Sequence, residues 1–416
     1  MSQDTVSKPL LELQKHSGQV KCSITPPSSK SESNRVLIID ALTGFKSDIQ
    51  NASNARDTQT MIRLLKSKDD TLDVIDAGTT MRFLTAYLAI TGQNKTLTGT
   101  KRMCERPIKL LVDALRSLGA DISYLANEGY PPLEIHHFDK SKVKTNHLKI
   151  RGDVSSQYIT ALLMVAPILP QGLVLELEGK VGSRPYIEMT LSLMAHFGVT
   201  ANWRENLINI SPQQYKPNQY KVESDWSGSS YWYSIAALSQ NAEIVLEGYN
   251  KKSFQGDSVI VKLMEPLGVK TTYTSTGLKL EKIPVQVTEG LSHDFTDCPD
   301  LAQTIAVICA ALGVEYTLSG LESLRIKETD RIAALQNELK KFGAEMVEIE
   351  KDKIYKVIKG AINVNGQEVS TYKDHRMAMA FAPLALRGNL KIENPDVVDK
   401  SYPHFWKDLK SAGFIF

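Results

Sequence analysis

The amino-acid sequence predicts an α/β protein of about six repeated units, each with one buried helix, one amphipathic helix and short strands between them. Three observations lead to this prediction: the length of the chain, a regular series of glycines after amphipathic helices, and a second series of apolar helices between them. At 416 residues the chain exceeds the size at which one hydrophobic core usually keeps growing, so two domains of roughly 200 residues are expected.

Five amphipathic segments end alike, with an apolar residue, a glycine and a further apolar residue. The glycines are Gly119, Gly198, Gly268, Gly343 and Gly413, at steps of 79, 70, 75 and 70 residues. A glycine at the C′ position of a helix, followed by a strand, explains each ending by itself. The nearly constant step indicates a repeated supersecondary unit.

A second type of helix alternates with the first, is apolar on every side and follows a polar cap. The expected caps and helices are Ser31 before 36–42, Thr79 before 81–90, Ser155-Ser156 before 158–165, Ser227 to Ser230 before 231–238, Asp300 before 301–312, and Asp374 before 377–386. Helices that are apolar all round belong in the interior. Serine, threonine and aspartate cap helices everywhere, so the caps alone do not indicate a ligand site.

The composition excludes several classes of protein. The chain is 42% hydrophobic and 23% charged with a net charge of +2, and it lacks the basic excess of a nucleic-acid binder. Cys22, Cys104, Cys298 and Cys309 show no Cys-x-x-Cys spacing, which suits a reducing compartment better than a zinc site or disulfides. With a polar start and no apolar run near the ~18 residues of a membrane span, we expect a cytoplasmic protein.

Basic residues recur at or beside the expected helix starts. They are Lys30, Arg35, Arg82 and Arg376, with Arg106, Lys327, Arg331 and Lys400 in short polar loops that lead into helices. A helix N-terminus carries unsatisfied N–H groups and the positive end of a dipole, so it attracts anions. Arginine and lysine at converging helix starts would therefore bind a small polyanion.

The segment Lys-Glu-Thr-Asp-Arg at 327–331 has the highest charge density of these loops. We expect Thr329 to cap the next helix, which places Arg331 in its first turn. Glu328, beside cations, could transfer protons near neutral pH if it is buried; the alternative is an exposed loop of ion pairs. Asp300 is ambiguous in the same way, as a plain N-cap or as a base directed into a site.

Other common motifs are absent. The chain has no G-x-x-x-x-G-K-[ST] phosphate loop and no G-x-G-x-x-G dinucleotide loop. His136 and His137 are interpreted as a solvated pair rather than metal ligands, and no serine or cysteine lies in a recognisable nucleophile motif.

Nine short motifs between Lys30 and Ala378 carry a resemblance to one family, which runs from about Lys21 to Phe405. They are Lys30–Arg35, Ala77–Arg82, Arg102–Pro107, Val154–Gln157, Ser183–Tyr186, Gln255–Asp257, Pro299–Asp300, Lys327–Arg331 and Asp374–Ala378. With them the sequence resembles the 3-phosphoshikimate 1-carboxyvinyltransferase (5-enolpyruvylshikimate-3-phosphate synthase) family of enolpyruvyl transferases.

The resemblance implies a two-domain inside-out α/β barrel built from six βαβαββ repeats, three per domain. It implies one discontinuous domain of residues 1–20 and 225–416, which carries the phosphoenolpyruvate-binding and catalytic residues. Residues 21–224 would form the second domain, which mainly binds shikimate 3-phosphate, with the active site in the cleft between the two.

The resemblance also implies an activity: transfer of the enolpyruvyl group of phosphoenolpyruvate to the 5-hydroxyl of shikimate 3-phosphate. The reaction is an addition–elimination through a tetrahedral intermediate, releases phosphate and belongs to chorismate and aromatic amino acid biosynthesis. Such chemistry needs an acid, a base and dense positive charge for two phosphates and two carboxylates. We expect no cofactor, metal, nucleic acid or membrane partner, and a monomeric protein.

Site residues are carried over by the same resemblance. Shikimate 3-phosphate would be bound by Lys30, Ser31, Arg35, Ser155, Ser156, Gln157, Ser183, Tyr186, Asp300, Ser323 and Lys327. Phosphoenolpyruvate would be bound by Lys30, Gly78, Arg106, Gln157, Arg331, Arg376 and Lys400. Asp300 would accept the hydroxyl proton, Glu328 would protonate the methylene carbon, and Lys30 would share in proton transfer.

Three single positions and one three-residue segment depart from the family pattern. Asp76 and Ser323 stand where the family usually has asparagine, Phe83 replaces a proline, and Trp226 to Gly228 replace smaller residues. Asp76 adds a negative charge near the expected phosphoenolpyruvate pocket, which bears on affinity there and on sensitivity to phosphonate analogues such as glyphosate.

Two alternative functions remain. One is the related transfer of enolpyruvyl to UDP-N-acetylglucosamine, against which Ser31, the serines at 155–156 and the Lys327 segment argue. The other is a non-catalytic, anion-binding repeat protein, which would bind RNA with a strong salt dependence and release no phosphate.

Overall fold

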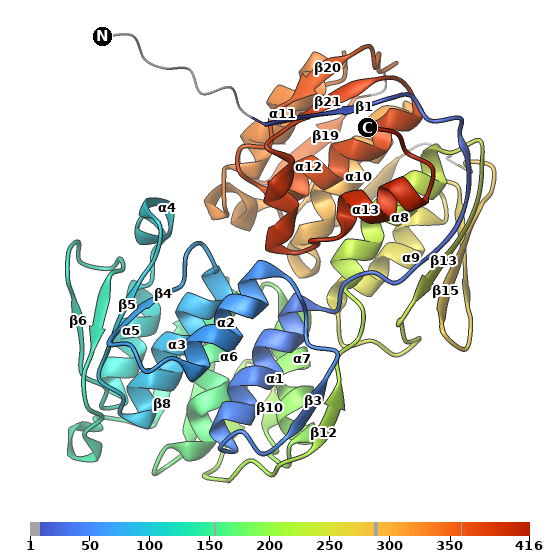
Figure 1. Ribbon diagram of the computed structural model, residues 1–416. Coiled ribbons are helices and arrows are strands. Elements are labelled where there is room, and N and C mark those ends of the chain that lie inside the picture. The colour runs from blue at the N-terminus through green and yellow to red at the C-terminus, as the bar shows by residue number, and fades with distance from the viewer. Residues whose placement is uncertain (1–8, 154, 287–289, 359) are drawn as a thin grey trace. The chain divides into compact units, whose positions relative to one another are not determined.

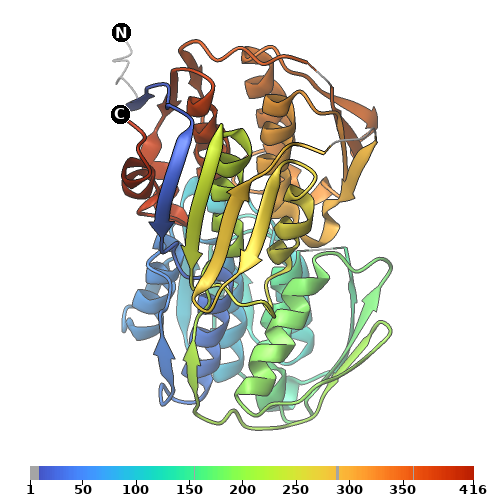
Figure 2. The same cartoon turned by 90° about the vertical axis from the view of Figure 1, so that its right-hand side faces the viewer.

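The computed structural model describes residues 9–153, 155–286, 290–358 and 360–416. Val154 of the fourth motif and residues 1–8 of the expected discontinuous domain lie outside the described residues. The chain divides into two compact units (Figures 1 and 2): residues up to 27 with 223–416, here the terminal unit, and residues 28–222, here the middle unit. The chain thus changes units after Pro27 and Val222, whereas the expected boundaries follow residues 20 and 224. Strand β2 (Gln19–Ile24) pairs in parallel with β13 (Asn241–Glu247), which keeps it in the terminal unit.

In the middle unit three buried helices pack on one another: α1 (Lys30–Leu42), α3 (Gly78–Thr91) and α6 (Ser156–Val165). The other helices are α2 (Arg56–Lys66), α4 (Lys101–Cys104), α5 (Lys109–Ser117) and α7 (Arg184–His196). The strands are β3 (Asp48–Gln50), β4 (Thr71–Asp73), β5 (Lys95–Thr98), β6 (Ile122–Tyr124), β7 (Leu133–Ile135), β8 (His147–Arg151), β9 (Leu173–Glu178), β10 (Asn202–Arg204), β11 (Leu207–Ile210) and β12 (Gln219–Lys221). The unit has its own hydrophobic core, formed largely by the three buried helices.

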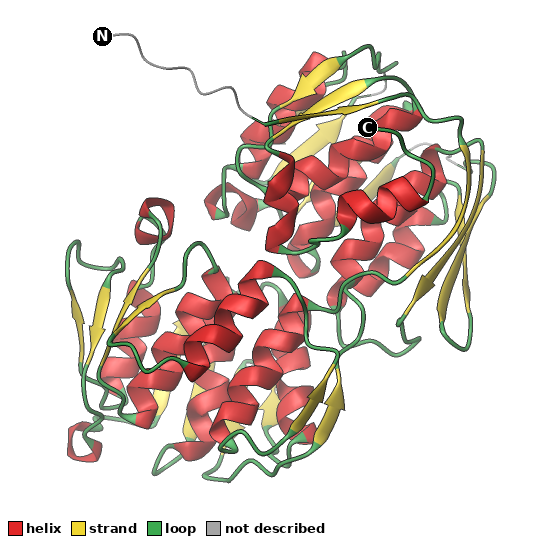
Figure 3. Ribbon diagram, viewed as in Figure 1, coloured by secondary structure: helices red, strands yellow, loops and turns green. Residues whose placement is uncertain are grey.

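The terminal unit repeats this arrangement with α8 (Trp226–Leu238), α10 (Ala302–Leu312) and α12 (His375–Phe381) at its centre. Its other helices are α9 (Ile260–Met264), α11 (Arg331–Lys341) and α13 (Phe405–Ser411). Its remaining strands are β1 (Leu10–Leu13), β14 (Val269–Tyr273), β15 (Gly277–Lys282), β16 (Leu291–Asp294), β17 (Tyr316–Ser319), β18 (Met346–Glu350), β19 (Ile354–Val357), β20 (Gln367–Val369) and β21 (Leu390–Glu393). In each unit the strands lie at the periphery and the apolar helices lie inside (Figure 3), as expected for helices without a polar face.

Four sheets share one topology, in which a parallel pair is followed by two antiparallel strands. Their orders are β4-β5-β7-β6, β8-β9-β11-β10, β2-β13-β15-β14 and β16-β17-β19-β18. Two shorter sheets, β12-β3 and β1-β21-β20, complete a set of three sheets per unit among the described residues. The predicted α/β fold of repeated units, three in each half, is thereby confirmed.

The five periodic glycines have the conformation that the repeat predicts. Gly119, Gly198, Gly268, Gly343 and Gly413 have φ angles of 98°, 85°, 92°, 80° and 95°. A residue with a side chain rarely adopts this left-handed region, which reverses the chain direction after a helix. Gly119, Gly198, Gly268 and Gly343 are each followed by a strand, namely β6, β10, β14 and β18, whereas Gly413 is followed by none among the described residues.

Several helices begin earlier than predicted. Helix α1 is capped by Ser29 rather than Ser31, α3 follows Ala77 rather than Thr79, and α8 follows Asp225 rather than the serines at 227–230. The expected caps thus lie inside the first turns.

Two further cap assignments needed correction and two were confirmed. Helix α11 is capped by Asp330, whose carboxylate accepts from two backbone N–H groups, and not by Thr329. Asp300 lies in a 3-10 turn (Pro299–Leu301) and caps nothing. Ser155 caps α6 and Asp374 caps α12, as predicted. None of the helices in the described part of the chain is long and apolar enough to cross a membrane.

Candidate functional site

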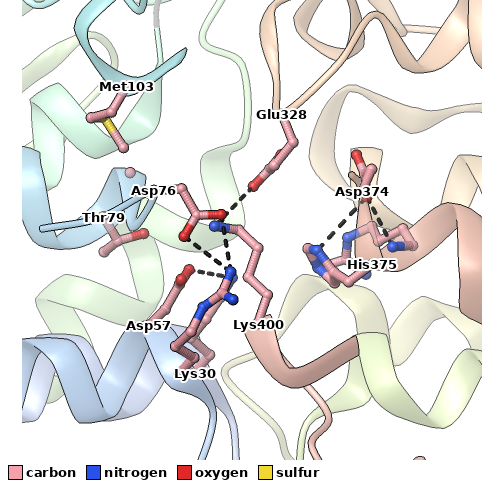
Figure 4. Close-up of polar contacts among 12 residues, drawn as sticks. Lys30, Asp57, Asp76, Thr79, Met103, Glu328, Asp374, His375 and Lys400 are labelled. Carbon is pink, nitrogen blue, oxygen red and sulfur yellow. Dashed lines mark hydrogen bonds and ion pairs between the residues drawn. The ribbon is translucent and has the colours of Figure 1, made fainter. Parts of the chain in front are cut away.

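The first turns of four helices meet in the middle unit. Lys30 is the first residue of α1, and its Nζ lies 3.1 Å from a carboxylate oxygen of Asp57 in the first turn of α2 (Figure 4). The Asp57 side chain is 3% exposed and that of Lys30 is 18% exposed. Thr80 in α3 donates from its hydroxyl to the Asp57 carbonyl at 3.3 Å. The amine of Lys30 is thereby held at a partly open position beside two further helix starts.

Helix α6 joins the same group through its first turn. The amide of Gln157 donates to the Thr79 hydroxyl at 3.2 Å, and Ser155 caps the helix by accepting from the Gln157 N–H at 3.4 Å. Ser155 is exposed, whereas Ser156 and Gln157 are half-buried. Hydroxyl and amide groups are therefore available next to the positive end of the helix.

Gly78 allows an arginine to lie directly on the start of α3. A Cβ at this position would be 2.7 Å from Nη1 and 2.9 Å from Nη2 of Arg106, so a larger residue would push the guanidinium away. Arg82 is buried and donates to the Pro107 carbonyl at 2.9 Å, which fixes the loop that carries Arg106. Arg106 is half-buried, and its guanidinium has no acceptor in the described part of the chain. That it binds an anionic substrate stays a prediction.

Arg35 is buried and joins α1 to α7. Its Nε donates to the Thr190 hydroxyl at 2.7 Å, Nη1 to the Ser31 carbonyl at 2.8 Å and Nη2 to the Tyr186 carbonyl at 3.4 Å. The guanidinium also lies over the Phe83 ring, at 5.4 Å from its centroid. Burial lowers the pKa of Arg35 to about 10. Its direct contact with substrate stays a prediction; these contacts give it a role in joining the two helices.

Ser183 precedes α7 in a left-handed conformation that non-glycine residues rarely adopt, with φ at 54°. Its side chain caps no backbone N–H of the helix. The loop is tied to the loop before α6, because the Gly182 N–H donates to the Gly152 carbonyl at 2.9 Å. This pairing brings the Ser183 and Ser155 loops side by side.

In the terminal unit Arg331 binds three carboxylates. Its Nε lies 2.7 Å from Asp374, its Nη1 3.0 Å from Asp300 and its Nη2 3.1 Å from Glu328. The Arg331 side chain is only 2% exposed. Burial alone would lower the pKa of Arg331, but the carboxylates of Asp374, Glu328 and Asp300 raise it above its ordinary value.

Arg376 provides the second cation for Asp300. It donates from Nη2 to the other oxygen of Asp300 at 2.6 Å and from Nη1 to the Tyr231 hydroxyl at 3.3 Å. Its Nε is buried without an acceptor among the described residues. Asp300 therefore faces two guanidinium groups. Of the two interpretations that the sequence left open for Asp300, the plain N-cap is wrong.

Glu328 lies between two buried cations. One carboxylate oxygen of Glu328 accepts from Arg331, and the other lies 3.8 Å from Nζ of Lys400. Figure 4 shows the contact between Glu328 and Lys400. The Lys400 and Glu328 side chains are 2% and 15% exposed. Lys327, directly before Glu328, and Ser323, five residues before it, are also half-buried. The segment 327–331 is thus part of a charge cluster and not an exposed loop.

Two acidic residues of these clusters were missed in the sequence. Asp57 resembles an ordinary first-turn acid of an amphipathic helix until its contact with Lys30 is known. Asp257 belongs to a family motif but received no role; it is buried and accepts a hydrogen bond from the Ser227 hydroxyl. Burial, with repulsion from Asp300, raises the pKa of Asp257 to about 7. Within the described residues no three histidine, cysteine or acidic side chains are grouped to hold a metal ion.

Comparison with known proteins gives consistent matches over nearly the whole chain. A family model described as EPSP synthase (3-phosphoshikimate 1-carboxyvinyltransferase) matches residues 14–68 and 64–409. A protein of that name from Bacteroides fragilis (strain YCH46) is 49% identical over 406 residues, which cover 95% of this chain and 96% of that protein. One from Mannheimia haemolytica is 36% identical, covering 94% and 96%.

Solved structures of low sequence identity share the fold. An EPSP synthase from Acinetobacter baumannii superimposes with a TM-score of 0.74 at 20% identity, covering 97% of this chain and 98% of that one. The enolpyruvyl transferase NikO from Streptomyces tendae gives a TM-score of 0.73 at 11% identity, covering 98% of each chain.

Proposed function

Because the chain belongs to the EPSP synthase family, we propose that it transfers the enolpyruvyl group of phosphoenolpyruvate to the 5-hydroxyl of shikimate 3-phosphate. The products would be 5-enolpyruvylshikimate 3-phosphate and phosphate, in the route to chorismate and aromatic amino acids. The observation that carries this proposal is 49% identity over 95% of the chain to a protein named for that reaction.

Two sets of cations support the assignment of substrates. Phosphoenolpyruvate and shikimate 3-phosphate each carry a phosphate and a carboxylate, so the enzyme must hold four anionic groups. We assign Lys30, Gln157, Ser183 and Tyr186 to shikimate 3-phosphate, together with Ser31, Arg35, Ser155, Ser156, Asp300, Ser323 and Lys327. Arg331, Arg376 and Lys400 would bind phosphoenolpyruvate with Lys30, Gly78, Arg106 and Gln157. Guanidinium groups suit this task because they bind carboxylate and phosphate in a bidentate manner.

Asp300 and Glu328 would perform the proton transfers. Each carboxylate now accepts from Arg331, and Asp300 also accepts from Arg376. An anionic substrate that took up these guanidinium donors would release the carboxylates. Asp300 could then accept the proton of the 5-hydroxyl, while Glu328 protonates the methylene carbon and Lys30 shares the proton transfer. The arginines would also stabilise charge in the tetrahedral intermediate.

The cellular setting is proposed as well. All four cysteines are free thiols, and Cys298 and Cys309 are buried, which suits a reducing compartment such as the cytoplasm. We expect a monomer, which light scattering coupled to size-exclusion chromatography would test.

The test of the proposed function is phosphate release from phosphoenolpyruvate with either of two acceptors. We expect release with shikimate 3-phosphate and none with UDP-N-acetylglucosamine. Asp300→Asn should abolish most of the release, whereas Asp396→Asn, at an exposed position, should not change it. Release with the UDP-sugar alone would support the related transferase. Release with neither acceptor, accompanied by salt-dependent RNA binding, would support the binding protein.

A further inference from the structure

Arg56 and Asp76 form an ion pair close to the start of α3. Neither residue is among those assigned above to a substrate. Nη2 of Arg56 lies 3.1 Å from each carboxylate oxygen of Asp76. Arg56 is the first residue of α2, and Asp76 lies two residues before Gly78. Their side chains are 42% and 28% exposed. The pair is therefore accessible to a ligand at this helix start.

The position of Asp76 poses an electrostatic problem. Asparagine is usual there in the family, and an aspartate places a negative charge beside the helix start where Gly78 and Arg106 meet. A carboxylate at that place would repel a phosphate or a carboxylate of the substrate. Arg56 carries the opposite charge and contacts both oxygens of Asp76, so the pair as a whole is neutral, as asparagine would be.

The contact with Asp76 uses only part of the hydrogen-bonding capacity of the Arg56 guanidinium. Only Nη2 donates to Asp76, and Nη1 and Nε have no acceptor in the described part of the chain. The next residue, Asp57, pairs with Lys30 of α1. The first turn of α2 thus sets the charge at two helix starts, at α3 through Arg56 and at α1 through Asp57.

We propose that Arg56 is a specificity-determining residue for phosphoenolpyruvate, because it cancels the charge of Asp76 at the anion site of Gly78 and Arg106. This inference rests on the proposed function and deepens it. The affinity for phosphoenolpyruvate should then follow the net charge of the pair. The competing interpretation is an ordinary surface ion pair, which contributes little to stability and would leave substrate binding unchanged.

Three variants and one control separate these interpretations. Arg56→Ala leaves a net charge of −1, the double variant Arg56→Ala with Asp76→Asn leaves zero, and Asp76→Asn leaves +1. We expect KM for phosphoenolpyruvate to rise about five- to tenfold in Arg56→Ala, to return to within about twofold of wild type in the double variant, and to fall in Asp76→Asn. The kcat and the KM for shikimate 3-phosphate should change less than about twofold in all three.

Arg63→Ala is the matched control, because Arg63 is an exposed arginine of the same helix whose guanidinium donates to the Asp73 carbonyl. It should leave both KM values unchanged. The difference between Arg56→Ala and the double variant should also shrink as salt is added, because ions screen exposed charges. Thermal melting of each variant identifies any loss of folding.

Titration calorimetry with phosphoenolpyruvate, in the absence of shikimate 3-phosphate, supplies a readout that needs no turnover. The dissociation constants should follow the same order of net charge. Equal constants in all variants, or a double variant as weak as Arg56→Ala, would overturn the inference while leaving the proposed function intact. Loss of phosphate release in the wild type, with the charge order preserved in binding, would instead overturn the proposed function alone.

Discussion

Arg331 and Asp374 form a buried ion pair between the starts of two helices: Nε of the first residue of α11 donates at 2.7 Å to the carboxylate that caps α12. The Asp374 side chain is fully buried and that of Arg331 is 2% exposed. Asp374 also accepts from Nη2 of Arg331 at 3.4 Å and from the backbone N–H of Arg376 at 2.8 Å. Asp374 therefore orients the Arg331 guanidinium, one of the two cations that hold Asp300, and fixes the backbone of the other, Arg376.

Removing this carboxylate should cost far more stability than removing an ordinary cap. We expect Asp374→Ala to lower the free energy of unfolding by about 3–5 kcal/mol, since it leaves a buried guanidinium partly unpaired. Asp330→Ala is the control: Asp330 caps α11 and pairs with Arg325 at 3.0 Å in a half-buried position, so its loss should cost only about 1–2 kcal/mol. Urea titrations measure both values, and equal costs would contradict the ion pair's structural role.

Glu328→Gln tests the proposed acid. The amide keeps the shape of the side chain but cannot donate the proton, so kcat should fall by about a hundredfold or more with little change in KM for phosphoenolpyruvate. Glu322→Gln, at an exposed position a few residues earlier, should retain normal turnover. Near-normal turnover in Glu328→Gln would remove Glu328 from this role.

Gly78→Ala should affect binding and not folding. The added Cβ would displace the end of the Arg106 side chain, which is flexible, so stability should hardly change. Loss of one charge-assisted contact should raise KM for phosphoenolpyruvate by about tenfold. Gly92→Ala at the other end of α3 should do the opposite: with φ at 72° it should cost about 1–2 kcal/mol and leave KM unchanged. A stable Gly78→Ala enzyme with unchanged KM would argue against an anion site here.

The pH dependence of stability should carry a contribution from Asp257. Burial and repulsion from Asp300 raise its pKa from 3.8 to about 7 in the folded protein. Between these values the folded state retains a proton that the unfolded state has lost, so this residue makes unfolding easier as the pH rises from about 4 to about 7.

Asp257→Asn removes that titration and keeps an acceptor for Ser227. The free energy of unfolding should then fall less between pH 4.5 and 7.5 than it does in the wild type, by urea titration at each pH. Asp396→Asn, at an exposed position, should follow the wild-type curve. Parallel curves for Asp257→Asn and the wild type would show that this carboxyl does not titrate in that range.

Much of the fold could be predicted because its requirements are local. The five glycines after amphipathic helices each needed a positive φ, and apolar helices such as α8 had no face to present to water. Helix starts were less accurate, because serine and threonine are typical of caps as well as of first turns. The hydroxyls near Lys30 and Trp226 proved to be in first turns.

The residue sequence alone determined the repeat, the family and the cations at helix starts, since each depends on residues close together in the chain or on motif order. Only the tertiary structure decided how those cations are balanced: Lys30 with Asp57, Arg56 with Asp76, and Arg331 with Asp374. Partners of this kind lie 20 to 43 residues apart and on different helices. Which of these residues pair depends on which helix starts meet when the apolar helices pack together. The spacing of the residues along the chain does not predict how far apart they lie in space.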